Sequence, residues 1–234
     1  MILIINYYEC ENLERQKEYI KCIILNLSNK YIEKIVLITD NNYNLDFINE
    51  KKNKIIQINL LNTNSKLTYK IAFDIANDYF KNYKCIIANT DIYFDDSIKL
   101  FNTISFTNKF FCLSRYEEEY KNEIGKFAPY YSQDSWIFES PVNINTNKLD
   151  FSLGEIGCDG KIAYEFYNQN YQINNPCLSI KSIHVHKSDF RTYHRRNQLP
   201  KPYVWTYACK IDDQSIVCIR DKFKIRPIKN NHVS

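Results

Sequence analysis

An acidic residue closes a short apolar run within residues 85–96. The run 85–88 is typical of a strand buried on both faces, and it ends at Asn89, Thr90 and Asp91. In open α/β sheets, ligands bind just outside the carboxyl ends of the strands. At such an end Asp91 could hold a divalent cation, and the cation could hold phosphate oxygens. An ordinary turn is the alternative, because Asn, Thr and Asp are common loop residues.

A second group of unusual residues surrounds Asp159. Three of the four glycines in the chain lie in residues 154–160, and this concentration of a scarce residue predicts a loop of special backbone shape. Their spacing differs from the dinucleotide-binding pattern G-x-G-x-x-G. A helical pattern runs from Asp159 to about residue 168. An aspartate at the start of a helix commonly serves as its N-cap.

Two histidines alternate in the extended segment 178–186. On a strand, His184 and His186 would point to the same face. A pair at this spacing indicates a metal site, whereas a lone histidine is usually structural. A His-x-His metallohydrolase would need further His or Asp ligands that the sequence does not show. The eight cysteines form no C-x-x-C pair, so the sequence does not indicate zinc.

The first half of the chain alternates between apolar runs and amphipathic helical patterns. Strands are expected at 2–5, 35–39, 55–60 and 85–89, and helices at 13–27 and 67–80. Asn12 could cap the first helix, whose polar face would carry Arg15 and Glu18. The alternation predicts an α/β fold with a mixed, mainly parallel sheet flanked by helices.

After Asp91 the expected strands are shorter and the loops longer. Strands are expected at 110–115, 135–138, 171–173 and 178–186. Glu117, Glu118 and Glu119 are interpreted as a solvated charge run. No linker divides the chain, so residues 1–234 are expected to form a single domain. Its core would end at about residue 190, and an extension over 191–234 would contain a hairpin pairing 204–211 with 216–219.

Composition narrows the class of protein. The chain has 234 residues, of which 44% are hydrophobic and 25% charged, as in ordinary soluble globular proteins. Its net charge of +4 is too small to indicate a nucleic-acid partner. Most cysteines sit in apolar runs and suggest buried thiols in a reducing compartment. The apolar run 2–5 is too short for a signal peptide or a transmembrane segment, so a cytoplasmic location is expected, in the host if the protein is viral.

Four motifs follow one another in an order that resembles a known family. They are N-T-D at 89–91, S-Q-D-S-W-I-F at 132–138, G-x-x-G-C-D at 154–159 and H-x-H-x-S at 184–188. In this order they resemble the nucleotide-sugar-dependent glycosyltransferases of the GT-A fold. The chain is most similar to small viral and bacterial members, such as the rhamnosyltransferase domain of a chlorovirus glycosyltransferase. The resemblance covers about residues 1–193.

The resemblance implies an inverting, metal-assisted sugar transfer from a nucleotide-diphosphate sugar, UDP-linked by expectation, to a hydroxyl on a glycan or another acceptor. In this family a D-x-D motif binds Mn²⁺ or Mg²⁺, which bridges the donor diphosphate. Here Asn89 replaces the first acid, which leaves Asp91 as the implied ligand, completed by His184 or His186. Cys158 replaces the first acid of the glycine-loop motif, so Asp159 is implied as the general base.

The resemblance also implies residues that bind the two substrates. Asn6, Tyr7 and Tyr8 would lie beside the nucleotide, with Asn89, Thr90 and Asp91 at the ribose, sugar and phosphates. Lys66 and Arg191 would pair with the phosphates, although plain surface charge is the alternative for Lys66. The implied acceptor residues are Gln133, Asp134, Trp136 and Gly157. Asp134 is also the second candidate for the base, and Trp136 could instead be part of the core.

Two other functions remain open at the level of sequence. A sugar nucleotidyltransferase would usually carry a loop with glycine and Lys or Arg after the first strand. The loop 6–10 (Asn-Tyr-Tyr-Glu-Cys) has neither, which counts against that reading. The other is a catalytically inactive relative that binds carbohydrate or nucleotide sugar, an interpretation that the substitutions at Asn89 and Cys158 keep open.

Overall fold

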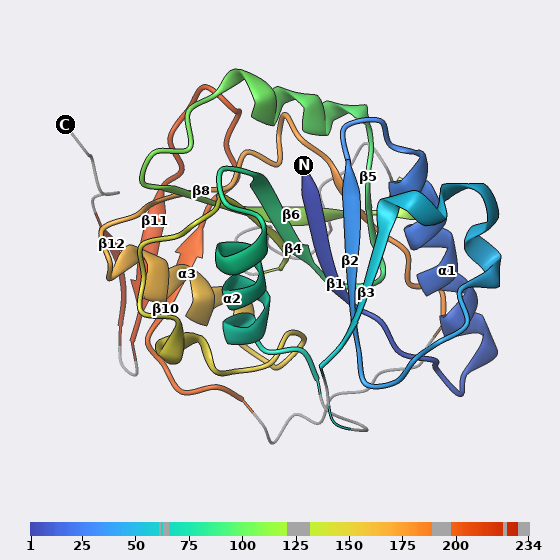
Figure 1. Cartoon of the computed structure of the whole chain (residues 1–234). Helices are drawn as coiled ribbons and strands as arrows, with labels where there is room; N and C mark the ends of the chain where they lie inside the picture. The colour runs from blue at the N-terminus through green and yellow to red at the C-terminus, as the bar shows by residue number, and fades with distance from the viewer. Residues whose placement is uncertain (61, 63–65, 121–131, 189–197, 222–223, 229–234) are drawn as a thin grey trace.

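A nine-stranded mixed sheet forms the centre of the molecule (Figure 1). The computed structural model describes the chain except residues 61, 63–65, 121–131, 189–197, 222–223 and 229–234. The strand order is β3-β2-β1-β4-β7-β6-β9-β5, and β8 pairs with β6. The strands are β1 (Ile2–Asn6), β2 (Lys34–Thr39), β3 (Ile55–Asn59), β4 (Lys84–Ala88), β5 (Ile92–Phe94), β6 (Lys109–Glu117), β7 (Gln133–Glu139), β8 (Gln172–Asn174) and β9 (Ser182–His184).

The first four strands of the sheet are parallel. β1 lies between β2 and β4, and β3 lies outside β2. Parallel neighbours need crossover connections. One is made by η1 (Asp46–Lys54), and the others by α1 (Leu13–Ser28) and α2 (Tyr69–Tyr79). The expected α/β fold with a mainly parallel sheet is confirmed, and β4 is central as expected.

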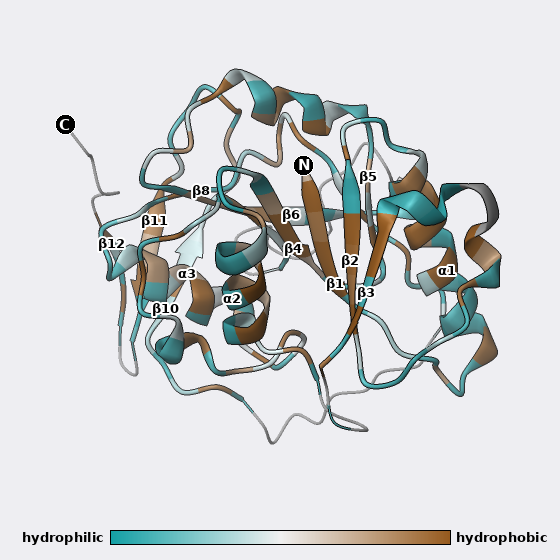
Figure 2. Ribbon diagram, in the orientation of Figure 1, coloured by the Kyte–Doolittle hydropathy of each residue, from teal (hydrophilic) through white to brown (hydrophobic). Residues whose placement is uncertain are grey.

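Residues of each strand alternate between two hydrophobic clusters on opposite faces of the sheet. Ile2 and Ile4 join the cluster under α2 and α3 (Cys158–Tyr167), whereas Leu3 and Ile5 join the cluster under α1 and η2 (Asp96–Thr103). Figure 1 places α1 and α2 on opposite sides of β1, and Figure 2 shows β1 as hydrophobic while α1 and α2 have mixed hydropathy. The two-residue side-chain period of a strand therefore builds both halves of the core.

The second half of the sheet is mixed and turns the chain back toward the first half. β7 runs antiparallel to both β4 and β6, so Ala88 pairs with Ser135. β5 pairs antiparallel with β9 so that Ile92 faces His184. The sequence did not predict β5, because three residues directly after a polar turn leave no readable alternation.

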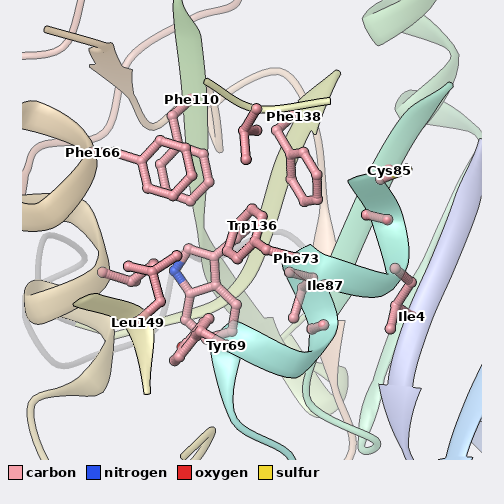
Figure 3. Close-up of a cluster of buried hydrophobic side chains, with 14 of the residues drawn as sticks. Ile4, Tyr69, Phe73, Cys85, Ile87, Phe110, Trp136, Phe138, Leu149 and Phe166 are labelled. Atoms are coloured by element: carbon pink, nitrogen blue, oxygen red, sulfur yellow. The ribbon is translucent and has the colours of Figure 1, made fainter. Parts of the chain in front are cut away.

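The aromatic core fixes α3 against the sheet. Phe166 stacks on Phe110 with ring centroids 3.6 Å apart, and Phe73 lies 4.5 Å from Phe138 (Figure 3). α3 begins one residue earlier than expected, at Cys158, and Gly157 is its N-cap in place of Asp159. The N-cap reading of Asp159 is therefore wrong.

The C-terminal extension forms a second, three-stranded antiparallel sheet. It contains β10 (Tyr203–Thr206), β11 (Val217–Arg220) and β12 (Ile225–Ile228), and β10 packs on α3. The expected pairing of the two segments occurs, with Thr206 opposite Val217, but the first strand is shorter than 204–211. The third strand was not predicted, because Pro227 argues against a strand except at a sheet edge. Among the described residues, no helix is both long and apolar enough to cross a membrane.

Candidate active site at the carboxyl edge of the sheet

The carboxyl ends of β1 and β4 are joined by hydrogen bonds of Asn6. Its Nδ2 donates to the Ile38 carbonyl at 3.2 Å, and its Oδ1 accepts from the Leu67 backbone N–H at 3.1 Å. The Asn6 carbonyl accepts a hydrogen bond from the Thr90 hydroxyl. Asn6 and Thr90, both expected beside the donor, thus hold the ends of β1 and β4 together, directly before Asp91.

Asp91 is a buried carboxylate in contact with two cationic side chains. It is 6% exposed, and its Oδ2 accepts from an Arg15 Nη and lies 3.1 Å from His184 Nε2. Burial alone would raise the pKa of Asp91, but His184 and Arg15 outweigh it and hold the pKa well below its usual range. Its other oxygen, Oδ1, has no hydrogen-bond partner among the described residues.

His184 lies between two carboxylates. Its Nδ1 is 2.8 Å from Glu117 Oε2, on the side opposite Asp91. Burial lowers the pKa of His184, but Asp91 and Glu117 together raise it to about 9. The reading of Glu117 as part of a solvated run is wrong, because the parallel pairing of β6 and β9 sets Glu117 directly beside His184.

The structure brings His186 to the same place. The ligand atoms of Asp91, His184 and His186 all lie within 4.8 Å of one another, and the two imidazole rings are 5.4 Å apart. The Ile92–His184 pairing and the bond from the Val185 N–H to the Asp91 carbonyl (2.9 Å) produce this arrangement.

The arrangement fits a divalent cation. One carboxylate and two imidazoles are suitable donors, and the buried, unpartnered Oδ1 of Asp91 is a ligand atom without a protein partner among the described residues. Glu117 behind His184 Nδ1 matches the usual way in which a carboxylate orients a metal-binding histidine. A metal at Nε2 would have to displace the proton that the raised pKa of His184 retains.

Helix α1 supplies a buried ion cluster that sequence reasoning missed. Besides Asp91, Arg15 contacts Glu18 (2.6 Å) and donates to the Val185 carbonyl at 3.2 Å. Glu18 accepts from the backbone N–H groups of Lys187 (2.6 Å) and Ser188 (2.9 Å). Arg15 and Glu18 were assigned to the solvent-facing side of α1. They are buried because the chain leaving β9 covers that side.

Asp134 lies across the sheet edge from this cluster. Its Oδ1 accepts from Asn89 Nδ2 and its Oδ2 from Arg115 Nη1, both at 2.7 Å. Arg115 also donates from Nε to Glu117 Oε1 at 2.9 Å. A chain of charged contacts therefore runs from His184 through Glu117 and Arg115 to Asp134.

Asp159 is a partly exposed carboxylate in the first turn of α3. Its oxygens accept from the N–H groups of Gly160 (3.1 Å) and Gln133 (3.4 Å). Burial and, second, the charge of Asp134 raise the pKa of Asp159 to about 7. A carboxyl group with this pKa can accept a proton near neutral pH.

The glycine loop is shaped by contact with Tyr203 of β10. Gly157 has φ +87°, and a Cβ there would lie 2.7 Å from the Tyr203 hydroxyl. A Cβ on Gly160 would lie 2.8 Å from the Tyr203 Cβ. Gly157, expected to contact the acceptor, is therefore required for packing of the C-terminal sheet. The sequence offers no local signal for Tyr203, which is 46 positions from Gly157 (203 − 157).

The two aromatic residues after β1 have different environments. Tyr7 is buried and packs edge-on against Tyr43, with ring centroids 5.4 Å apart. Tyr8 is partly exposed, and its hydroxyl lies 2.8 Å from that of Tyr19. The Tyr19 hydroxyl in turn accepts from Arg15 Nε at 3.2 Å. Hydrogen bonds through Tyr19 and Arg15 therefore connect the partly exposed Tyr8 to Asp91. Tyr7 belongs to the core.

The remaining expected residues are scattered. Trp136 is 0% exposed and packs edge-on on Tyr69 at 4.9 Å, so of its two open readings the structure supports the core (Figure 3). Gln133 is buried beside Asp159. Lys66 is exposed, one residue before the Leu67 N–H that binds Asn6. Arg191 lies outside the described residues.

Comparison with known proteins supports the fold. No family model and no curated protein matches the sequence. A solved mannosyltransferase, PcManGT from Pyrobaculum calidifontis in complex with GDP-Man and Mn²⁺, is similar with a TM-score of 0.53 and 9% identity over 82% of this chain. The match spans 58% of the mannosyltransferase chain. The chain therefore has a GT-A-like α/β fold, with a mixed sheet flanked by helices.

Two further structures match less well. TarS 1-349 from S. aureus, in complex with UDP-GlcNAc, has a TM-score of 0.46 and 11% identity over 86% of this chain and 61% of its own. The inositol-1-phosphate CTP transferase from T. maritima has a TM-score of 0.42 and 14% identity, and the match covers 79% of this chain and 84% of the transferase chain.

Proposed function

We propose that this protein is a glycosyltransferase that moves a sugar from a nucleotide-diphosphate sugar to a hydroxyl acceptor. The observation that carries the proposal is the placement of two complementary groups at one sheet edge. The cluster of buried Asp91 and His184 with the partly exposed His186 suits a cation and an anionic leaving group. Asp159 has a pKa raised to about 7. The mannosyltransferase of similar fold, solved with GDP-Man and Mn²⁺, supports this assignment.

The reaction needs one proton acceptor and one stabilised leaving group. The acceptor hydroxyl oxygen attacks the anomeric carbon while the bond from that carbon to the phosphate oxygen breaks. Asp159 takes the hydroxyl proton, and the nucleoside diphosphate leaves with the electron pair. Attack opposite the leaving group inverts the anomeric configuration. Asp159 suits this role because a carboxyl group with a pKa of about 7 can accept a proton near neutral pH.

Asp91, His184 and His186 would hold a divalent cation, Mn²⁺ or Mg²⁺, and Glu117 would orient His184. When bound, the cation would supply positive charge that stabilises the departing diphosphate. Arg15, at Asp91 Oδ2, adds a fixed positive charge to the same region. Asn89 and Tyr8 are the partly exposed residues that we assign to the donor, and UDP is the nucleotide that we expect.

The state of the cysteine thiols indicates the cellular compartment in which we expect the protein. All eight cysteines are free and buried, which supports a reducing environment such as the cytoplasm. The narrower similarity to small viral and bacterial glycosyltransferases, such as the rhamnosyltransferase domain of a chlorovirus enzyme, stays a prediction.

The test is a screen of UDP-, GDP- and dTDP-sugars with Mn²⁺ and a set of glycan acceptors. Acceptor-dependent release of nucleoside diphosphate is the expected result, and it should be lost in Asp159→Asn. Release of pyrophosphate from a nucleoside triphosphate and a sugar phosphate would instead show a nucleotidyltransferase. A donor-induced rise in melting temperature without turnover by any acceptor would indicate a non-catalytic nucleotide-sugar-binding protein.

A further inference from the structure

The carboxylate of Glu18 accepts hydrogen bonds at both of its oxygens. Oε1 accepts from the backbone N–H groups of Lys187 (2.6 Å) and Ser188 (2.9 Å). Oε2 accepts from Arg15 Nη1 (2.6 Å) and from the Ser188 hydroxyl (3.0 Å). Glu18 is 7% exposed, and hydrogen bonds to an ionised group are strong. The backbone at 187–188 is therefore fixed to helix α1, although it lies outside β9.

His186 lies between two fixed points of this segment. Before it, the Val185 N–H donates to the Asp91 carbonyl (2.9 Å), and the Val185 carbonyl accepts from Arg15 Nη1 (3.2 Å). After it come the two N–H groups that Glu18 binds. His186 is beyond the last residue of β9, so strand pairing does not set its direction. The contacts of α1 with the backbone on either side hold its imidazole beside the other two ligands.

We propose that Glu18 is a positioning residue of the metal site, which fixes the His186 imidazole as a ligand by binding the backbone that follows it. The inference deepens the proposed function and rests on it for the presence of the cation. The geometry needs a carboxylate, because one oxygen accepts from two N–H groups and the other from a guanidinium and a hydroxyl. In Glu18→Gln the amide has one accepting oxygen, so donors at one of the two ends would lose their partner.

The first experiment measures Mn²⁺ binding to the full chain by electron paramagnetic resonance of the free ion, without donor or turnover. In Glu18→Gln we expect the dissociation constant for Mn²⁺ to rise about 10-fold, as is usual when a residue that orients a metal ligand is lost. Glu14→Gln is the matched control, since it removes an exposed carboxylate of the same helix that pairs with Lys17. It should bind Mn²⁺ like wild type.

A double-mutant cycle tests whether Glu18 acts through His186. In the His186→Ala background the ligand that Glu18 positions is already absent, so Glu18→Gln should not weaken Mn²⁺ binding further. A Glu18 that only stabilises the fold would lower the urea midpoint in both backgrounds and leave Mn²⁺ affinity unchanged in each. An effect passed through Arg15 to Asp91 would weaken binding by the same factor in both.

A second variant covers the case in which Glu18→Gln does not fold. Glu18→Asp keeps a negative charge next to Arg15, which is buried and needs a partner. Its shorter side chain cannot reach Arg15 and the two N–H groups of 187–188 together. The same loss of Mn²⁺ affinity, and the same absence of a further loss in the His186→Ala background, are expected of it.

The outcomes separate this inference from the proposed function. Equal Mn²⁺ affinity in Glu18→Gln and Glu14→Gln would overturn the inference, and so would an equal loss in both backgrounds of the cycle, whether or not the protein transfers sugars. A wild-type chain that binds no Mn²⁺ would overturn it together with the metal-assisted chemistry. A loss that disappears in the His186→Ala background would support the inference even if no donor is turned over, and the missing turnover would then reject the glycosyltransferase alone.

Discussion

Asp159 is the residue whose protonation should set the pH dependence of the reaction. Its pKa is raised to about 7 by burial and by Asp134, so below that pH most molecules carry a protonated Asp159 that cannot act as a base. We expect kcat/KM for transfer to rise about tenfold per pH unit up to near neutrality and then to level off. A rate profile that stays flat between pH 5 and 8 would contradict the assignment.

Replacing Asp159 by Asn should separate catalysis from stability. Transfer should fall by about 10²–10⁴-fold with donor affinity unchanged, since Asn cannot accept the proton. In the folded chain the pKa is about 7 against an ordinary 3.8, so the stability that the protonated group contributes is lost as pH rises through that interval. The melting temperature of Asp159→Asn, relative to wild type, should therefore be higher at pH 8 than at pH 5.

The exposed Asp78 on α2 provides the control for this substitution. Asp78→Asn should change neither transfer nor the pH dependence of melting. A gain in melting temperature that is the same at pH 5 and pH 8 for Asp159→Asn would show that the folded protein does not hold the Asp159 proton.

His186 is the member of the metal cluster that can be removed with least damage to the fold. Asp91 and His184 are buried among other charges, whereas His186 is partly exposed. His186→Ala should weaken Mn²⁺ binding by at least about 10-fold. Electron paramagnetic resonance of free Mn²⁺ measures this without any donor or turnover. Lys187→Ala, on the exposed neighbour, should bind Mn²⁺ like wild type, and equal binding by both variants would exclude His186 as a ligand.

At the scale of elements, the glycine loop joins the two sheets. Gly154 and Gly157 both have positive φ, but only at Gly157 would a Cβ meet Tyr203. Gly154→Ala should cost the backbone strain alone, about 1 kcal/mol, and Gly157→Ala should cost more, up to about 3 kcal/mol. Urea unfolding of the two variants measures the difference. Equal losses would show that the Tyr203 ring moves aside without cost.

Most elements could be predicted because their signals are local. The α1 boundaries and its Asn12 cap follow from residues that touch within one turn, and the strands of the parallel half follow from short apolar runs. In the candidate site, the strand signals led to Asp91 and His184, which stand at or just beyond the ends of β4 and β9, and the alternation with His184 added His186.

The partners of these residues could not be predicted, because they arrive through strand pairing. Arg15 meets Asp91 across 76 positions, and Glu117 meets His184 across 67. Helical periodicity places Arg15 on the polar face of α1, and in an isolated α1 this face would be exposed to solvent. It is β9 and the chain leaving it that bury this face, and no property of residues 13–28 encodes that contact.

At the scale of the whole molecule, the two sheets share one helix. α3 packs against β6 and β8 of the large sheet and against β10 of the small one, and Phe166 and Val204 lie in the same hydrophobic cluster. A helix shared in this way should prevent either sheet from unfolding by itself. We therefore expect a single cooperative transition for the chain, as the proposed single domain requires.

The two tryptophans of the chain make this expectation measurable. Trp136 lies in β7 of the large sheet and Trp205 in β10 of the small one. In Trp205→Phe the fluorescence reports the large sheet, and in Trp136→Phe it reports the small sheet. Within each sample, fluorescence and far-ultraviolet circular dichroism should give the same urea midpoint. If the small sheet lost its fluorescence change at a lower urea concentration than the dichroism, residues 198–228 would be a separate folding unit, and the single-domain prediction would be wrong.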